Sequence, residues 1–335
     1  MRILAAPDKF RGTASASAIA AAVAEAARRA GWGVDAVAVS DGGEGLLEVL
    51  GGSVRHTEVT GPLGGRVAAE WRLKGDTAVV EMAMASGLDL AGGPAGNDAM
   101  NASTTGTGEL IEAALGAGAR TVIVGLGGSA TTDGGLGCVE ALRPHGRLAA
   151  VDLIAACDVS TTFVDAADLF AGQKGATAAE VALLHRRLDR LAQLYEDSFG
   201  VDVRDLPGSG AAGGLGGGLA AIGARLVPGF DLVADSLGLE DRIDGVDLVI
   251  TGEGLLDAQS FNGKAVGGMV ELAAEAGTDV LVIVGEIDDG FDLATLPPGV
   301  EVVSLVERFG RERAMADVER CVAEVVDRRL SGPIA

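Results

Sequence analysis

The sequence predicts an α/β protein of two domains, in which a mostly parallel β-sheet is covered by helices. Short aliphatic runs recur along the chain, and most of them are followed by a segment with helical periodicity. Strands that alternate with helices are typical of a doubly wound sheet. The length of 335 residues exceeds that of one ordinary compact domain, which favours two.

Seven aliphatic runs are the predicted strands. Their apolar character is continuous rather than alternating, which indicates strands that are covered on both faces. The runs comprise residues 2–8, 33–41, 120–128, 151–158, 247–254, 279–286 and 301–307. Between the first two, residues 15–31 carry apolar side chains at spacings of three and four, which predicts an amphipathic helix.

Two segments break the alternation of strand and helix. Residues 54–82, with TGPLGG in the middle, predict antiparallel hairpins, and residues 174–203 predict one long helix that ends near Gly200. We therefore expect a flavodoxin-like or Rossmann-like domain made from both chain ends, residues 1–65 plus 240–335. The inserted residues 66–239 would form the second α/β domain.

The composition excludes some classes of partner. The net charge of −22 would repel duplex nucleic acid and anionic membrane surfaces, so neither is expected to bind. Three cysteines without metal-type spacing indicate free thiols in a reducing compartment. No signal peptide and no uncharged apolar run of membrane-spanning length is evident. We expect a cytoplasmic monomer or homodimer that acts on a small molecule.

Polar residues stand at the ends of several predicted strands. Ligands of open parallel sheets bind beyond the carboxyl ends of the strands, so these residues predict a ligand site. Helix N-capping is the alternative for each aspartate. The residues at these ends are Asp8, Asp41, Gly127, Gly128, Ser129, Asp158, Glu253 and Asp257.

Lysines and glycines add the groups that bind phosphate. Three of the four lysines, Lys9, Lys174 and Lys264, lie in polar or glycine-flanked loops, where a compact mobile charge is useful. The run GAAGGLGGG (210–218) can present backbone N–H groups to phosphates, with close helix packing as the alternative. Phosphoryl transfer needs cations with Mg²⁺, backbone N–H groups and a carboxylate that orients the attacking hydroxyl.

The common nucleotide-binding motifs, the P-loop and the dinucleotide-binding loop, are matched poorly by this sequence. Around Gly263-Lys264, Ala258 and Ala265 occupy the Gly and Ser/Thr positions of a P-loop, so this segment is not one. GLGGSA (125–130) follows a predicted strand and fits the looser dinucleotide-binding pattern. An NAD(P)-dependent dehydrogenase is therefore an alternative, although no acidic residue on a second strand is evident for the ribose.

An ordered set of motifs resembles one family along essentially the whole chain. The motifs include APDKFRGTASA (6–16), SDGGEGL (40–46), EMAMASGL (81–88), GLGGSATTDGG (125–135), ACDV (156–159), GQKGA (172–176) and TGEGLLDAQSFNGK (251–264). This order is similar to that of bacterial type I glycerate kinases. The resemblance implies ATP, Mg²⁺, D-glycerate as acceptor and 2-phosphoglycerate as product. It also implies two α/β domains with the active site in the cleft between them.

The resemblance, taken with the strand-end pattern, assigns roles to residues. Asp8 or Asp41 would orient the glycerate hydroxyl, and Arg11 and Lys264 would neutralise phosphate or the glycerate carboxylate. The nucleotide would be contacted by Gly127, Gly128, Ser129, Lys174, Gly213 and Gly214. The metal would be held by Asp133, Asp158, Glu253 and Asp257.

The chain also departs from the family pattern. Leu255 replaces the usual Arg of the TGEG loop, and residues 160–163 (STTF) replace an NPL turn and a GPNG-like loop. Both changes remove groups of the kind that stabilise charge during phosphoryl transfer. A non-catalytic ligand-binding paralogue on a kinase scaffold, or an enzyme for a related small hydroxy acid, is therefore a further alternative.

Overall fold

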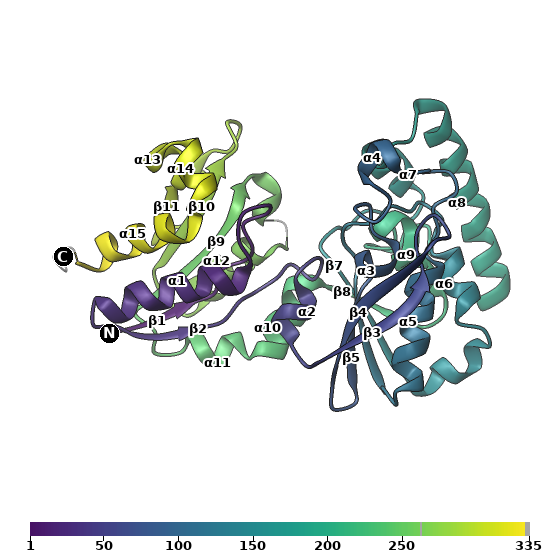
Figure 1. Cartoon of the computed structure of the whole chain (residues 1–335), viewed down its shortest axis with the longest axis horizontal. Helices are drawn as coiled ribbons and strands as arrows, with labels where there is room; N and C mark the ends of the chain where they lie inside the picture. Colours follow the sequence, from purple (N-terminus) through teal and green to yellow (C-terminus); the bar gives the residue numbers. More distant parts are fainter. Residues whose placement is uncertain (262, 332–335) are drawn as a thin grey trace. The chain divides into compact units, whose positions relative to one another are not determined.

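The structure is a computed structural model that describes residues 1–261 and 263–331. Unit 1 comprises Met1–Asp41 and Phe230–Ala335, and unit 2 comprises Gly42–Gly229. Figure 1 shows the course of the chain. These limits differ from the predicted boundaries at 65/66 and 239/240. Residues 53–60 already pair within the sheet of unit 2, and the ring of Phe230 lies 2.1 Å from where a Cβ of Gly268 would stand.

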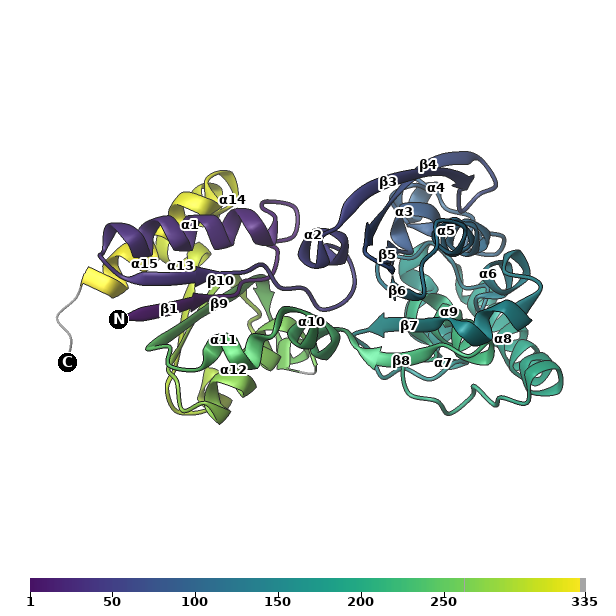
Figure 2. The ribbon, with the colours of Figure 1, turned by 90° about the horizontal axis from the view of Figure 1, so that it is seen from below.

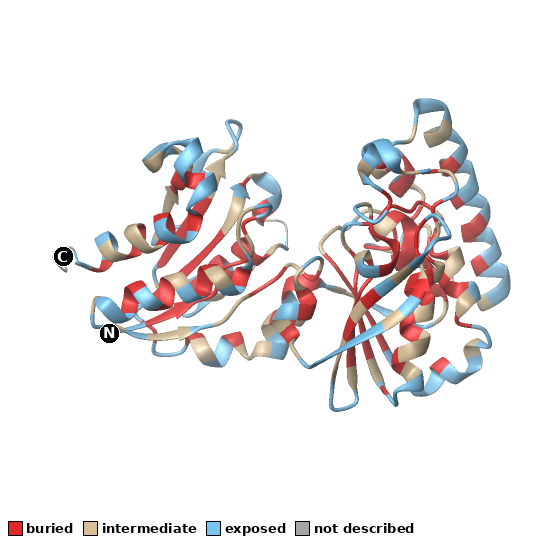
Figure 3. Ribbon diagram, in the orientation of Figure 1, coloured by how far each residue is buried: buried red, intermediate tan, exposed pale blue. Residues whose placement is uncertain are grey.

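Unit 1 is built on a five-stranded parallel sheet with the order β11-β10-β9-β1-β2. Numbered within the unit, this order is 2-1-3-4-5, that of flavodoxin-like folds, which confirms the predicted fold class. Figure 3 shows that the central strands of both sheets are largely buried. The strands of unit 1 are β1 (Arg2–Ala5), β2 (Gly33–Ala36), β9 (Leu248–Leu256), β10 (Val280–Ile287) and β11 (Val300–Ser304).

The helices of unit 1 bury aliphatic side chains against this sheet. Helices α1 and α15 share one core with β1, β9 and β10, to which they contribute Ile19, Val23 and Val322 among others. Ser15 caps α1 by accepting the N–H of Ala18 (3.2 Å). The helices are α1 (Ala16–Arg29), α10 (Gly229–Leu237), α11 (Leu239–Ile243), η3 (Ala258–Phe261), α12 (Ala265–Glu275), η4 (Leu293–Thr295), α13 (Leu305–Phe309), α14 (Arg311–Ala316) and α15 (Val318–Ser331).

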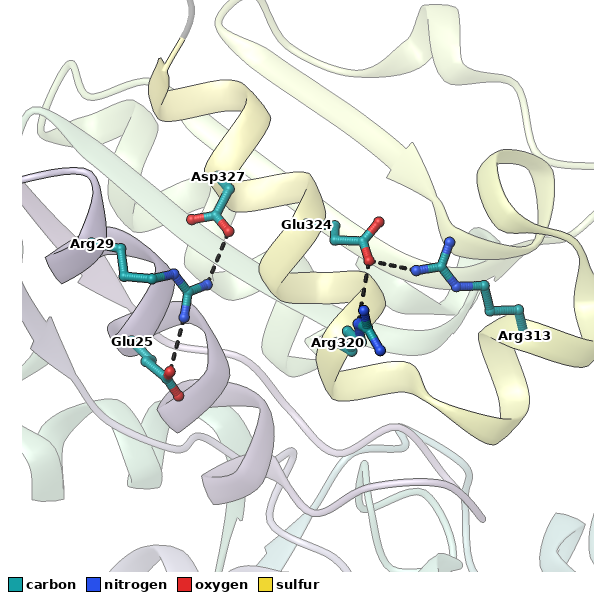
Figure 4. Close-up of polar contacts among 6 residues, drawn as sticks. All are labelled: Glu25, Arg29, Arg313, Arg320, Glu324 and Asp327. Atoms are coloured by element: carbon teal, nitrogen blue, oxygen red, sulfur yellow. Dashed lines mark hydrogen bonds and ion pairs between the residues drawn. The ribbon is translucent and has the colours of Figure 1, made fainter.

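Ion pairs on the surface of unit 1 link its helices. Arg29 of α1 contacts Glu25 of the same helix and Asp327 of α15, each at 2.9 Å (Figure 4). Glu324 of α15 pairs in turn with Arg313 and Arg320. Because these side chains are largely exposed, the pairs contribute little to stability, and the shared aliphatic core holds the helices together.

Unit 2 contains a mixed six-stranded sheet with the order β3-β4-β5-β6-β7-β8. Strands β3, β4 and β5 pair antiparallel, which confirms the hairpins predicted over residues 54–82, and the others pair parallel. Only the short β8 was missed by the sequence analysis. The strands are β3 (Ser53–Thr60), β4 (Arg66–Lys74), β5 (Thr77–Glu81), β6 (Thr121–Gly125), β7 (Asp152–Cys157) and β8 (Arg225–Pro228).

Unit 2 has ten helical segments. Figure 2 shows its helices around the sheet. The predicted long helix is α8, which begins after a capping box of Thr177 and Glu180 and ends at Gly200 in a left-handed conformation. The helices are α2 (Leu46–Leu50), α3 (Ala83–Ser86), α4 (Gly93–Gly96), α5 (Thr105–Gly116), α6 (Leu136–Ala141), η1 (His145–Ala150), α7 (Asp165–Phe170), η2 (Gly172–Lys174), α8 (Ala178–Phe199) and α9 (Ala211–Ala221).

The three cysteines, Cys138, Cys157 and Cys321, are buried free thiols. Burial raises the pKa of Cys157 to about 11, so this thiol is protonated at neutral pH. Of the helices that the structure describes, none is long and apolar enough to cross a membrane.

Candidate active site

Asp8 lies just beyond β1, in the loop that leads to α1. Its N–H donates to the carbonyl oxygen of Gly252 in β9 (2.9 Å), which fixes the loop against the neighbouring strand. The residue is only 7% exposed. Burial raises the pKa of Asp8 to about 7; Lys9 and Lys264 oppose this rise, and the charge of Asp41 adds to it. Asp8 therefore gains its charge near neutral pH, under the influence of two lysines and a second carboxylate.

Glu253 belongs to β9, the strand next to β1. Burial raises the pKa of Glu253 to about 7; a hydrogen bond from Ser260 and the charge of Lys264 oppose the rise, whereas Asp8 and Asp257 add to it. Its Oε1 is buried and has no hydrogen-bond partner among the residues that the structure describes. Buried acceptors are usually satisfied, so this oxygen is a candidate ligand for a cation.

Asp257 directly follows β9. Its Oδ1 accepts the N–H groups of Gln259 (2.8 Å) and Ser260 (3.0 Å), and it thereby caps the start of η3. The N-capping alternative therefore applies to this residue, although its charge also acts on Glu253. These interactions join six side chains, which we call the unit 1 carboxylate cluster: Asp8, Lys9, Asp41, Glu253, Asp257 and Lys264.

The unit 1 carboxylate cluster is not a preformed metal cage. Within residues 1–261 and 263–331, no three His, Cys, Asp or Glu side chains are placed to hold one metal ion together. Mg²⁺ at phosphate sites usually takes one or two carboxylates and completes its octahedron with waters and phosphate oxygens. Glu253, with its unpartnered Oε1, and the neighbouring Asp257 fit a site of that kind.

Glycines of the TGEG motif allow the site loops to approach β9. A Cβ on Gly252 would lie 1.9 Å from the carbonyl oxygen of Ile283, and one on Gly254 would lie 3.1 Å from the backbone nitrogen of Arg11. The loop that carries Asp8 and Arg11 therefore packs directly on the strand that carries Glu253. Arg11 is exposed on this loop. Lys264 occupies the N-cap position of α12.

Two glycine-rich loops of unit 2, residues 42–45 and 126–129, lie against each other. A Cβ on Gly127 would stand 3.1 Å from the Cα of Gly43. The first loop is fixed by Glu81, which ends β5 and is buried. Its Oε1 accepts the N–H groups of Gly45 and Leu47, both at 2.9 Å. A buried carboxylate thus holds the turn that follows Asp41.

The second loop places the predicted residues Gly127, Gly128 and Ser129 directly after β6. Gly128 is exposed and has a φ of +65°, a conformation that favours glycine. Its carbonyl oxygen accepts the N–H of Leu88 (2.8 Å), and the N–H of Ala130 donates to Ser86 (2.9 Å). The loop is therefore tied down on both sides of Ser129, while the backbone at Gly128 faces solvent.

The contacts of Asp133 do not support its predicted role as a metal ligand. Its Oδ2 accepts the N–H and the hydroxyl of Thr104 (2.9 and 2.8 Å) and the N–H of Gly137 (3.3 Å). Its Oδ1 accepts the N–H of Gly135 (3.1 Å). Burial raises the pKa of Asp133, and these four donors oppose the rise. Four protein donors therefore already bind the oxygens of this carboxylate.

Lys174, Gly213 and Gly214 also differ from their predicted roles. Lys174 is 4% exposed, so it is not the mobile charge that its glycine-flanked loop suggested. Gly213 and Gly214 are buried, and a Cβ on Gly213 would lie 1.9 Å from the carbonyl oxygen of Thr131. The alternative of close packing therefore describes this glycine run better than a phosphate cradle does.

Asp158 directly follows β7 in unit 2 and is partly buried. Its charge adds to the effect of burial in raising the pKa of Cys157. The structure thus brings Asp8, Asp41, Glu253, Asp257 and Lys264 together in unit 1. Asp158 belongs instead to unit 2, where it follows β7.

Sequence reasoning missed three residues that shape the loops. Glu81 had a signal, because a lone acidic residue ends the otherwise aliphatic strand TAVVE. Asn97 donates from Nδ2 to the carbonyl oxygens of Ala130 and Lys174, both at 2.9 Å. Neither Asn97 nor Thr104 carried a signal, because each acts through contacts with residues remote in sequence.

Comparison with known proteins agrees with the motifs. A family model described as the glycerate kinase family matches residues 3–144 and 143–330. Glycerate 2-kinase of Escherichia coli K12 is 39% identical over 330 residues, which cover 86% of each chain. Glycerate kinase of Bacillus subtilis 168 is 38% identical over an alignment of length 374, which covers 97% of each chain. A crystal structure assigned as glycerate kinase 2 of Salmonella typhimurium LT2 has a TM-score of 0.81 at 34% identity and covers 99% of this chain and 97% of its own.

Proposed function

Because this chain belongs to the glycerate kinase family, we propose that it transfers the γ-phosphoryl group of ATP, with Mg²⁺, to a hydroxyl group of D-glycerate. The match of the family model from residue 3 to residue 330 is the observation that carries this proposal. The name of the Escherichia coli relative, glycerate 2-kinase, favours 2-phosphoglycerate as the product. The reaction is proposed to take place in the cytoplasm, and a related small hydroxy acid is the alternative acceptor.

Asp8 is the carboxylate that we assign to the acceptor hydroxyl. A group that accepts a proton works best when its pKa lies near the working pH, and burial raises the pKa of Asp8 to about 7. Asp41 contributes by adding to that rise. During transfer the hydroxyl oxygen bonds to the γ-phosphorus, and the bond from this phosphorus to the bridging oxygen of ADP breaks. The hydroxyl proton passes to the Asp8 carboxylate.

The phosphate groups are assigned to the remaining charges of unit 1. Glu253 and Asp257 would hold Mg²⁺, and the fit rests on the buried Oε1 of Glu253, which has no partner among the described residues. When bound, Mg²⁺ supplies positive charge to the phosphate oxygens. Lys264 interacts electrostatically with both Asp8 and Glu253 and is therefore placed to neutralise phosphate charge beside the acceptor. Arg11, exposed on the same loop as Asp8, supplies a further cation.

The glycine-rich loops of unit 2 offer backbone groups rather than charge. The loops 42–45 and 126–129 meet through glycines, and the backbone at Gly128 is exposed. Backbone N–H groups in such turns bind anionic oxygens without a cationic side chain. We assign Gly127, Gly128 and Ser129 to the nucleotide phosphates. Gly213 and Gly214 are assigned to packing, because both are buried.

An ADP-release assay over a panel of small hydroxy acids tests this function. We expect turnover that requires both ATP and Mg²⁺ and is fastest with D-glycerate, and phosphorus NMR of the product would identify the phosphorylated hydroxyl. Asp8→Asn serves as the control for contaminating kinases and should lower kcat by roughly 100-fold or more. Absence of turnover with every acid of the panel would refute the proposal and leave a non-catalytic paralogue.

A further inference from the structure

The amine of Lys174 lies beneath the glycine-rich loop that follows β6. The lysine ends the short helix η2 and is 4% exposed. Its Nζ donates to the carbonyl oxygen of Thr131 (2.6 Å). A charged donor makes a stronger hydrogen bond to a carbonyl than a neutral donor does. The amine thus makes its hydrogen bond inside the protein.

A second side chain reinforces this link. Asn97 donates through Nδ2 to the carbonyl oxygens of Ala130 and Lys174 (both 2.9 Å). The loop and the turn that carries the lysine are therefore joined twice, once through Nζ at Thr131 and once through Asn97 at the preceding residue. The adjacent carbonyl groups of Ala130 and Thr131 are thus held by the side chains of Asn97 and Lys174.

Asp133 holds the far end of the loop and supplies the opposite charge. Its carboxylate accepts four hydrogen bonds, from Thr104, Gly135 and Gly137. Burial lowers the pKa of Lys174 to about 7, and the negative charge of Asp133 opposes that fall. A buried charge is tolerated when a partner of opposite sign compensates it. The buried Lys174 and the part-buried Asp133 therefore act on each other electrostatically.

We propose that Lys174 and Asp133 are positioning residues that hold loop 126–133 in the shape required for binding the nucleotide phosphates, and that neither contacts the nucleotide or its metal. This inference rests on the proposed function of the loop. It divides the loop into an anchored half, residues 130–133, and a ligand-facing half, Gly127–Ser129. Gly128 is exposed and Ser129 is 7% exposed, whereas the carbonyl of Thr131 is buried and accepts the Nζ of Lys174.

Hydrogen exchange measured by mass spectrometry on the ligand-free protein tests the inference without any substrate. In Lys174→Met, we expect the amides of residues 126–135 to exchange about tenfold faster or more, the factor for losing one charge-assisted hydrogen bond. Peptides of α1 in unit 1 should exchange at the wild-type rate. The matched control is Lys74→Met, which removes the same charge from an exposed position at the end of β4 in the same unit.

Binding of a fluorescent ADP analogue separates positioning from direct contact. If Lys174 positions the loop, Lys174→Met weakens binding, but the dependence of the Kd on salt keeps its wild-type slope. Weaker binding with a flatter salt dependence and unchanged exchange would mean that the lysine contacts phosphate, and the inference would be wrong. Wild-type exchange and wild-type binding in Lys174→Met would also overturn it.

Two further variants keep the test decisive if Lys174→Met does not fold. Lys174→Gln retains an N–H donor and should exchange more slowly than Lys174→Met, whereas equal exchange rates would contradict the role of the Thr131 hydrogen bond. The double variant Lys174→Met/Asp133→Asn should be less impaired than the sum of its single variants, since it leaves neither charge uncompensated. If wild-type protein shows no turnover but the exchange results hold, the proposed function fails and the positioning role stands.

Discussion

Replacing Asp8 with Asn should stabilise the folded protein at neutral and alkaline pH while it removes turnover. The pKa of Asp8 rises from an ordinary 3.8 to about 7 in the fold, mainly through burial. Below 3.8 the carboxyl is protonated in both states and stability is unaffected. Between 3.8 and about 7 the folded state keeps a proton that the unfolded state has released, so stability falls as pH rises. Above about pH 7 the Asp8 carboxyl is ionised in both the folded and the unfolded state, and stability falls no further.

The size of the effect follows from the same interval. At about 1.4 kcal/mol for each pH unit, the rise from 3.8 to about 7 corresponds to a loss of about 4 kcal/mol above neutral pH. At about pH 5 the loss is only about 2 kcal/mol, because most of the folded protein still holds the proton. Asp8→Asn escapes this loss. It also lowers the pKa of Glu253, which the charge of Asp8 helps to raise.

Urea unfolding of the wild type and of Asp8→Asn at about pH 5 and about pH 8 measures the difference. We expect the difference in free energy of unfolding between the variant and the wild type to be about 2–3 kcal/mol larger at about pH 8 than at about pH 5. Asp327→Asn is the control, since Asp327 lies in a partly exposed ion pair with Arg29 and should change stability by about 1 kcal/mol or less at either pH. An advantage of Asp8→Asn that is the same at both pH values, or absent at the higher one, would refute the reasoning.

Three further predictions concern unit 2. Gly213→Ala should destabilise the protein by about 3 kcal/mol or more, because φ is +69° and the new Cβ would stand 1.9 Å from the carbonyl oxygen of Thr131; an unchanged urea midpoint would contradict this. Glu81→Ala should lower the free energy of unfolding by about 2–4 kcal/mol and reduce turnover, because two N–H groups lose their acceptor, whereas Glu81→Gln should lose less in both measurements. Thr177→Ala should lower the free energy of unfolding by about 1 kcal/mol through loss of the capping box and leave kcat unchanged, so that a fall in kcat would tie α8 to the reaction.

Much of the fold could be predicted from local patterns. The parallel strands can be recognised in the sequence as continuous aliphatic runs, and α8 has a capping box at one end and Gly200 at the other. The short strand β8 could not be found, because Arg225–Pro228 contains two apolar side chains and ends in proline. The predicted boundary at 65/66 differs from the division after Asp41, because a hairpin strand does not reveal from its sequence which sheet it joins.

The sequence offers candidate site residues where polar side chains follow strand ends, but it does not show which of them are buried. Asp8, Glu253 and Lys264 could be selected as candidates because each stands next to glycine or follows an aliphatic run, and the structure shows electrostatic interactions among them. Their roles in the site stay predictions. Lys174 looked equally exposed in the sequence. Its burial depends on the carbonyl of Thr131, which lies 43 positions away in the chain. Tertiary contacts of this range leave no local pattern.

The position of β1 has a consequence for synthesis on the ribosome. This strand is synthesised well before β9, yet it lies between β9 and β2 in the sheet, and Ile3 pairs with Leu248 of β9. Residues 42–229 are translated in between and contain every strand of the second sheet, so they can fold while the ribosome is still at work. Until β9 is made, one edge of β1 has no strand to pair with, and an unpaired strand edge can pair with other chains. Translation that stops before β9 would therefore release a chain with a folded unit 2 and with β1 and β2 as a strand pair whose unpaired edge favours aggregation.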